Sequence, residues 1–263
     1  MANVFRCFFV NLSHFLFLRA LMVEILTGVV LRTIKYSDNL IIVDMYTKER
    51  GRSSFLLPVS RGKRSKVRNV LFQPLSMLTF TVNLGKRGGL SRISDAQPYI
   101  LYNTIPYDVI KSSVAIYIAE FLTAVLHEEG SNESLFAYLD YSLSFFDNVD
   151  DNVSADFHIL FLLQLTRFLG IYPNVENSSQ YSYFDLMAGT LVNEHPLHAH
   201  YLSPEDTRNF IKLLSVDFNS MHTLSMNRKA RGEYLALIQN YYSLHIPDFP
   251  SLRSAEIFKE LFN

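Results

Sequence analysis

The chain has no tryptophan and only one cysteine, Cys7, among its 263 residues. A single cysteine cannot form a disulfide within the chain or supply a zinc site made of several thiolates, and a chain without disulfides suits a reducing cytoplasm. Catalytic signatures are missing as well: there is no G-x-S-x-G element, and Gly85–Gly89 lacks the spacing of a phosphate-binding loop before a helix. These absences favour a protein that is not an enzyme and needs no cofactor.

A long apolar run is also missing. Phe8–Leu18 is apolar, but Asn11, Ser13 and His14 interrupt it, so it falls short of the ~20 apolar residues that span a bilayer. It resembles the core of a signal peptide, yet no small-residue cleavage site follows it. We therefore expect the folded domain to begin near Met22, with residues 1–21 as a non-native or over-extended start that can be removed.

Apolar residues make up 49% of the sequence, with 21 Phe and 15 Tyr, which is typical of a globular protein with a substantial core. Charge divides this chain in two. Residues 1–105 carry 15 Lys and Arg against 5 Asp and Glu, a balance of +10; residues 106–263 carry 9 against 20, a balance of −11, and the two sum to −1. A basic part beside an acidic part indicates two regions with different partners, one of them a polyanion.

The basic part reads as β structure. Its apolar residues alternate, and short polar or glycine-containing turns separate the alternating segments. In the first segment we expect Val29, Leu31 and Thr33 to share one face. The five predicted strands are Thr27–Lys35, Leu40–Tyr46, Arg52–Val59, Leu75–Leu84 and Leu90–Ile93. Five strands without a long intervening helix predict a small closed barrel of the OB-fold type over residues 22–105.

The acidic part reads as helical. Apolar spacing predicts a helix over Tyr107–Glu128, with Pro106 at its start and Gly130 past its end. A second helix is predicted from Ser131 or Asn132 to Phe146, and a third over 154–169. Residues 174–202 read as irregular. Three more helices are predicted after them: one from about 205, capped by Ser203, one at 228–244 and one at 254–262. The predicted fold class is therefore α+β, with an N-terminal five-stranded barrel followed by an all-α domain over 106–263.

The candidate binding residues are cations of the predicted barrel loops. Eleven cations against one acid, Glu49, fall between Lys48 and Arg92. Clustered cations repel one another unless an anion lies among them, and Lys and Arg side chains suit phosphate oxygens. The predicted DNA-binding residues are Arg50, Arg52, Arg61, Lys63, Arg64, Lys66, Arg68, Lys86, Arg87 and Arg92. The alternative is a basic surface that is merely solvated.

Other candidate sites are weaker. His195, His198 and His200 are close enough in sequence to bind a metal, but Pro196 and the lack of a nearby thiolate favour ordinary surface histidines, so no metal site is predicted. The acidic residues before the third predicted helix read as helix-end and turn acids rather than metal ligands. These acids are Asp140, Asp147, Asp150 and Asp151.

The order of several short motifs resembles the RecO family of bacterial DNA repair proteins, which are recombination mediators. In the predicted barrel these are the strand Thr27–Thr33 with Tyr36–Asp38, the turn Tyr46–Gly51 and the segment Leu71–Leu75. In the helical part they are Tyr117–Phe121, Leu165–Pro173 and the closing segment Tyr241–Phe262. Each motif is weak alone, but their collinear order over about 22–262 is more specific.

The resemblance implies a protein that binds single- and double-stranded DNA, anneals complementary strands, and helps load the recombinase RecA together with RecR. It implies further contact with the C-terminal tail of single-stranded-DNA-binding protein, for which Arg167 is a candidate because cations are scarce in the helical part. It also implies a cytoplasmic, nucleoid-associated protein without a membrane partner. Many relatives carry four zinc-binding cysteines where this chain has none, at about 174–202, so Tyr181, Tyr183, Phe184 and Leu186 are expected to fill that region instead.

Two other functions fit the residues. The first is a generic single-strand-binding OB protein whose helices serve only for oligomerisation. The second is a protein-interaction adaptor whose basic loops meet an acidic partner and no DNA. Strand annealing separates the mediator from the generic binder, and salt-dependent binding to an oligonucleotide separates both from the adaptor.

Overall fold

A computed structural model describes residues 23–59, 70–84, 89–127, 130–150, 154–176, 182–224 and 226–254. The chain divides into two compact units, Met1–Leu101 with His127–Asn132, and Tyr102–Leu126 with Glu133–Asn263. We call them the barrel unit and the helical unit, and each is described by itself. Residues 1–21 lie outside the described residues.

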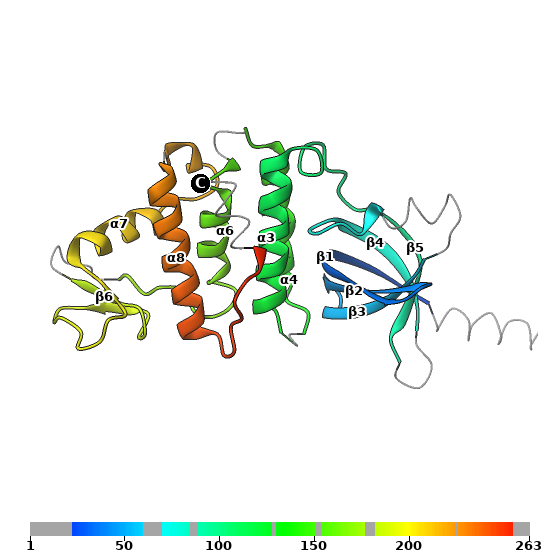
Figure 1. The fold of residues 1–263 in the computed structure, drawn as a ribbon, viewed down its shortest axis with the longest axis horizontal. Helices are drawn as coiled ribbons and strands as arrows, with labels where there is room; N and C mark the ends of the chain where they lie inside the picture. The colour runs from blue at the N-terminus through cyan, green and yellow to red at the C-terminus, as the bar shows by residue number, and fades with distance from the viewer. Residues whose placement is uncertain are drawn as a thin grey trace, which may run out of the picture. The chain divides into compact units, whose positions relative to one another are not determined.

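The barrel unit consists of β1 (Val23–Ser37), β2 (Leu40–Thr47), β3 (Gly51–Pro58), β4 (Met77–Asn83) and β5 (Ser91–Pro98). They close in the order β1-β2-β3-β5-β4, and Figure 1 shows them in blue to green. Neighbouring strands are antiparallel except β3 and β5, which pair in parallel. The predicted OB-like barrel is confirmed, with β5 reaching beyond its predicted end at Ile93 to Pro98.

β1 is long enough to pair with two neighbours, β4 through Val23–Val29 and β2 from Gly28 onward. The prediction that Val29, Leu31 and Thr33 share one face is wrong, although Val29 and Leu31 are both buried and only Thr33 is exposed. The barrel core instead takes Leu26 and Val30 from this strand, together with Val43, Met45 and Phe55. A β-bulge separates Thr33 from Val29: Val30 pairs with Met45 and Arg32 with the adjacent Asp44, so Leu31 is an extra residue and the alternation reverses after it.

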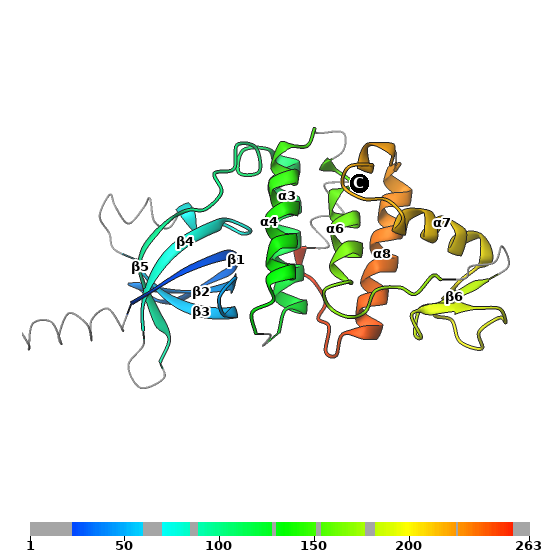
Figure 2. The same cartoon turned by 180° about the vertical axis from the view of Figure 1, so that it is seen from behind.

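The helical unit contains five α-helices among its described residues, shown in green to orange in Figure 2. They are α3 (Val109–Val125), α4 (Glu133–Asn148), α6 (Phe157–Leu165), α7 (Pro204–Leu214) and α8 (Arg228–His245). α6 is apolar all round, and it lies between α4 and α8, where eight of its nine residues are buried. The α+β fold class is thereby confirmed, while the last predicted helix lies mostly outside the described residues.

Side-chain caps start both α3 and α7. The Ser203 cap was predicted, whereas α3 begins at Val109 after Asp108, two residues later than its predicted start at Tyr107. Asp108 accepts a hydrogen bond from the Lys111 N–H at the start of α3 (2.7 Å), and Ser203 accepts one from Asp206 before α7 (3.2 Å). Pro204 occupies the first position of α7, where its missing N–H costs nothing. No helix in the described part of the chain combines the length and apolarity that a bilayer crossing requires.

Residues 174–202 were expected to be irregular, and this was wrong. They contain a three-stranded sheet, ordered β7-β6-β8, made of β6 (Tyr183–Asp185), β7 (Thr190–Val192) and β8 (Tyr201–Leu202). Strands of two or three residues are too short to show a period of two, so the alternation test cannot detect them. Phe184 and Leu186 are buried there as expected, Tyr183 is partly buried, and Tyr181 lies outside the described residues.

Candidate nucleic-acid interface

Most of the predicted DNA-binding cations lie outside the described residues. They are Arg61, Lys63, Arg64, Lys66, Arg68, Lys86 and Arg87. The strand ends on either side of these segments are described. Phe55 pairs with Ser91 and Asn83 with Arg92, so the end of β3, the end of β4 and the start of β5 lie at one end of the barrel.

Arg50 lies at the opposite end of the barrel. Arg50 comes directly before Gly51, the first residue of β3, which pairs with Thr47 at the end of β2. The last residue of β3, Pro58, pairs with Leu40 at the start of β2, so Arg50 and Pro58 are at opposite ends of the strand pair. The guanidinium of Arg50 forms an ion pair with Glu24, in which Nε lies 3.2 Å from Oε1 and Nη2 contacts Oε2. The strand register therefore separates Arg50 from Arg92 and from the strand ends next to the basic segments, and a carboxylate already neutralises its charge.

Arg52 and Arg92 lie on the outer surface of the barrel. Arg52 alternates with Phe55 and Leu57 of the core, and Arg92 alternates with the core residue Ile93. Because successive strand residues point to opposite faces, both guanidinium groups start from the outside of the sheet. Leu56, which pairs with Arg92, lies between them on the same face.

A third arginine, Arg32, joins this face because of the bulge at Leu31. Its Nε donates to Asp44 Oδ2 at 2.6 Å, and Arg52 Nη2 lies 4.0 Å from the same oxygen. Ser54 Oγ donates to the other carboxylate oxygen at 2.5 Å. The side chain of Asp44 is 6% exposed and that of Arg32 is 50% exposed. A buried carboxylate therefore lies beside two arginines, of which Arg32 is half exposed and Arg52 is mostly buried, with 20% of its side chain exposed.

Both arginines of this cluster are charged. Burial lowers the pKa of Arg52, the Asp44 carboxylate raises it, and neighbouring Arg32 lowers it, for a net decrease. A guanidinium nevertheless stays charged at any physiological pH. Two cations thus contact one buried carboxylate on this surface.

The sequence reasoning missed Arg32 and Asp44. The available signal was a pair of opposite charges within two otherwise apolar strands, which cross-strand pairing rules connect. The predicted alternation already placed Arg32 on the face opposite Leu31 and Thr33. What the sequence does not show is that Asp44 and Arg52 lie beside Arg32, because that depends on the register between strands.

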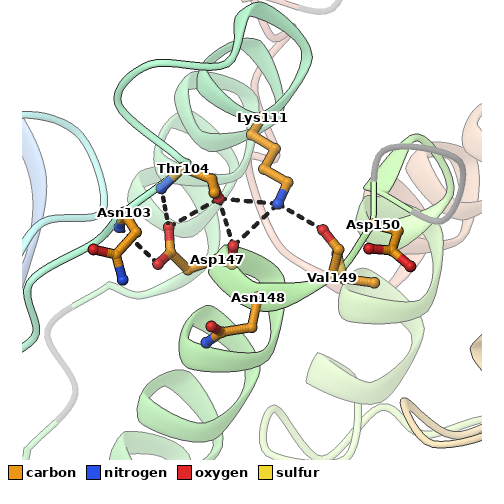
Figure 3. A pocket seen from close by; sticks show the side chains of 7 residues that line it. All are labelled: Asn103, Thr104, Lys111, Asp147, Asn148, Val149 and Asp150. Carbon is orange, nitrogen blue, oxygen red and sulfur yellow. Dashed lines mark hydrogen bonds between the residues drawn. The ribbon is translucent and has the colours of Figure 1, made fainter.

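The helical unit has a polar pocket of about 550 Å³. Figure 3 shows the residues that line it: Asn103, Thr104, Lys111, Asp147, Asn148, Val149 and Asp150. Lys111 is buried, and its ammonium donates to Thr104 Oγ1 (2.9 Å) and to the carbonyl oxygens of Asp147 (3.0 Å) and Val149 (2.6 Å). The three N–H donors of the ammonium therefore each have an acceptor within the protein. The arrangement stabilises the fold and leaves no N–H of Lys111 for a ligand.

Asp147 fixes the segment that leads into α3. Its carboxylate accepts hydrogen bonds from the backbone N–H groups of Asn103 (2.8 Å), Thr104 (2.8 Å) and Ile105 (3.0 Å). Burial raises the pKa of Asp147, but these hydrogen bonds outweigh it and lower the pKa below its ordinary value. The residue read as a helix-end acid is thus a buried structural acceptor.

Other candidates in the helical unit have local partners. Arg167 lies 4.4 Å above the ring of Tyr172 and donates to its hydroxyl at 3.0 Å, a surface cation–π pair. His195 Nε2 lies 2.8 Å from Tyr201 Oη, and His198 Nε2 lies 3.2 Å from Asp185 Oδ2. Within the described residues, no group of three His, Cys, Asp or Glu side chains is placed to hold a metal ion.

Glu120, in the Tyr117–Phe121 motif, has a similar anchoring role. Its carboxylate accepts the N–H groups of Arg253 (2.9 Å) and Ser254 (2.8 Å) and also contacts Ser254 Oγ. Burial raises its pKa, and the hydrogen bonds from Ser254 and Arg253 more than offset this, so the net pKa is lowered. The carboxylate therefore ties the segment around residue 254 to α3.

The chain resembles one protein family over both units. Residues 22–102 match the family model "Recombination protein O N terminal", and residues 106–254 match "Recombination protein O C terminal". The DNA repair protein RecO of Phocaeicola vulgatus is 42% identical over 92% of this chain and 100% of its own length. The RecO proteins of Bacteroides fragilis (41%; 92% of this chain and 100% of the relative) and Flavobacterium psychrophilum (32%; 90% and 98%) are also similar. The chain belongs to the RecO family.

Proposed function

We propose that this protein acts in DNA repair as a recombination mediator without catalytic turnover: it binds single- and double-stranded DNA, anneals complementary strands, and works with RecR to load RecA. Membership of the RecO family supports the repair role. The observation that carries the DNA-binding part is the closed barrel whose strand ends adjoin the two most basic segments, 61–68 and 86–92.

Electrostatics support backbone contact rather than base readout. In the sequence, the cations of segments 61–68 and 86–87 follow the ends of β3 and β4, and they are clustered as contacts to a phosphate backbone require. Contacts to phosphates leave base edges free to pair, which is what annealing requires. The helical unit, which contains most of the acidic excess, would take the protein partners, including RecR and the tail of single-stranded-DNA-binding protein.

The first experiment replaces five cations by Ala: Arg61, Lys63, Arg64, Lys66 and Arg68. We expect affinity for a random-sequence oligonucleotide to fall, and the slope of log affinity against log salt to decrease by about 0.7 for each single-strand phosphate that the variant no longer neutralises. A matched double variant, Lys212→Ala/Lys229→Ala, removes cations of the helical unit and should bind as the unsubstituted protein does. Unchanged affinity in the five-fold variant would refute the assignment of this segment.

The second experiment separates the candidate functions. Complementary oligonucleotides labelled at their ends report annealing, and a mediator should accelerate it whereas a generic single-strand binder should slow it. Salt-dependent binding without annealing would favour the generic binder, and no binding of DNA at low salt would favour the adaptor. Recombinase loading is then tested with RecA, RecR and DNA covered by single-stranded-DNA-binding protein.

A further inference from the structure

The small sheet of β6, β7 and β8 carries a loop that presents an apolar side chain to water. Figures 1 and 2 show this sheet beside α7, on the side of α8 away from α3. Residues 193–200 form the loop between β7 and β8, and Leu197 in its middle is 104% exposed. Met187, in the turn between β6 and β7, is 52% exposed. Single exposed apolar residues are common, so the way in which this loop is held decides what its exposure means.

A hydrogen-bond network centred on Asp185 holds the loop. The Asp185 carboxylate accepts the N–H of Met187 at 2.9 Å through Oδ1, and its Oδ2 lies 3.2 Å from Nε2 of His198. His198 Nδ1 accepts the N–H of His200 at 3.2 Å, and this selects the tautomer whose Nε2–H donates to Asp185. One carboxylate thus positions the turn that bears Met187 and the neighbour of Leu197.

Aromatic contacts support the same loop. His195 Nε2 lies 2.8 Å from Tyr201 Oη, and the rings of His195, Tyr183 and Tyr201 have centroids 4.7, 5.3 and 5.8 Å apart. Because these contacts order the loop in the free protein, a partner that covers Leu197 does not have to order it on binding. An exposed aliphatic side chain on a preordered support is what an interface anchor requires.

The charge around the loop indicates the chemistry of the partner. Residues 168–207 contain no Lys or Arg and five acids. Glu194, three residues before Leu197, is exposed. An apolar anchor within an acidic surface is complementary to an apolar surface that lies among cations. The acids of this stretch are Glu176, Asp185, Glu194, Glu205 and Asp206.

The barrel unit of the same chain has such a surface. Leu84 and Leu90, 36% and 42% exposed, come directly before and after residues 85–89, which contain Lys86 and Arg87. These leucines adjoin the end of β4 and the start of β5, which lie at the same end of the barrel as the end of β3. Segment 61–68, with five cations, follows β3 in the sequence. Exposed apolar side chains and cations therefore occur together at this end.

We propose that the partner is a second copy of this chain: the loop 193–200 of one molecule docks through Leu197 on the basic end of the barrel unit of another. The contact joins two different surfaces, so it builds rings or open chains rather than symmetric pairs. It covers the surface to which the proposed function assigns DNA, and this part of the inference rests on that function. DNA should therefore displace the loop and return the protein to monomers.

Sedimentation velocity of the full chain without DNA tests the contact. At low salt the average mass should rise with protein concentration, and high salt should reverse the rise because it screens the charges. Leu197→Asp should weaken the association about tenfold, although a contact driven by charge alone would be strengthened by the added carboxylate. Val109→Asp, which makes the same change at an exposed residue of α3, should have no effect. A monomer at every concentration would overturn the inference and leave the proposed function intact.

Mixing two defective variants tests whether the contact joins loop to barrel. Leu197→Asp lacks a working loop, and the variant with Ala at Arg61, Lys63, Arg64, Lys66 and Arg68 lacks a working barrel surface. Each should be monomeric alone, and their mixture should form pairs and nothing larger, because only one loop and one barrel remain competent. Unchanged melting temperatures establish that both variants fold. A mixture that stays monomeric, or that forms assemblies larger than pairs, would overturn the inference.

A short single-stranded oligonucleotide tests the shared surface. Added to the assembled protein, it should produce DNA-bound monomers, and at high protein concentration Leu197→Asp should bind it more tightly than the unsubstituted protein does. Protein that binds the oligonucleotide and stays assembled would overturn the placement of the contact on the basic end of the barrel. Protein that assembles but binds no DNA would contradict the proposed function, while the contact between copies would stand.

Discussion

At the scale of the residue, Asp147 concentrates more structural interactions than its place in the sequence suggests. A carboxylate at the C-terminal end of a helix faces the negative end of the helix dipole, which is unfavourable. Three backbone N–H donors and the buried Lys111 beside it supply the compensation. The same backbone hydrogen bonds lower its pKa, and this links the stability of the helical unit to pH.

The dependence of stability on pH that arises from Asp147 has a definite sign. A carboxyl with a lowered pKa in the folded state contributes stability above its unfolded pKa, about 3.9 for Asp, and the contribution is lost as pH falls toward the folded pKa. We expect Asp147→Asn to lower the free energy of unfolding at pH 7 by about 2 kcal/mol and to flatten its decline below about pH 4. Urea unfolding at several pH values measures both effects.

A control on the same helix keeps this result specific. Glu133→Gln, on the exposed first turn of α4, should change the free energy of unfolding by less than about 0.5 kcal/mol. If the two variants gave the same pH profile, Asp147 would have no special role in the acid stability of the helical unit.

At the scale of the element, two glycines of the helical unit have opposite requirements. Gly189, in the turn between β6 and β7, has φ +66°, and a Cβ there would lie 2.9 Å from the Tyr241 hydroxyl, which donates to the Ile171 carbonyl oxygen. Gly232 lies inside α8, and a Cβ there would meet nothing within 4 Å. Glycine is therefore required at the turn and is unfavourable in the helix.

Replacement of glycine by alanine should consequently change the stability of the protein in opposite directions at the two positions. Gly189→Ala should destabilise the protein by at least about 1 kcal/mol, through the strained backbone and the displaced tyrosine. Gly232→Ala should stabilise it by about 1 kcal/mol, because alanine favours the helix and restricts the unfolded chain. Thermal unfolding of the two variants in parallel measures the difference, and a shift of the same sign in both would contradict this account.

At the scale of the whole molecule, the charge division predicts which backbone amides bound DNA protects from hydrogen exchange. Hydrogen exchange measured with and without a single-stranded oligonucleotide at low salt should slow at the end of β3, the end of β4 and the start of β5, next to the basic segments. Amides of α4, α6 and α8 should exchange as before, because their surroundings carry the acidic excess that repels phosphate. Protection confined to the helical unit would contradict the placement of DNA on the barrel.

The large divisions of this molecule were predictable, and the details that depend on tertiary pairing were not. The change from a period of two to helical spacing predicted the barrel, the helices and their order. Capping chemistry predicted the start of α7 at Ser203. The sheet of β6, β7 and β8 was missed because it joins short segments as distant in the chain as Phe184 and Leu202, which show no pattern of their own. Arg32 was missed because its partners Asp44 and Arg52 come from other strands, and the register that brings them together does not show in the sequence of β1.

The bulge at Leu31 has one further consequence. Leu31 lies just after the part of β1 that pairs with β4, within the part that pairs with β2. The residue that orients Arg32 therefore also lies near the point where β1 changes from one neighbouring strand to the other. Insertion or deletion of one residue there would exchange the inner and outer side chains of everything downstream in the strand. A change in the length of β1 at this point should therefore disturb the barrel more than a substitution that keeps the register.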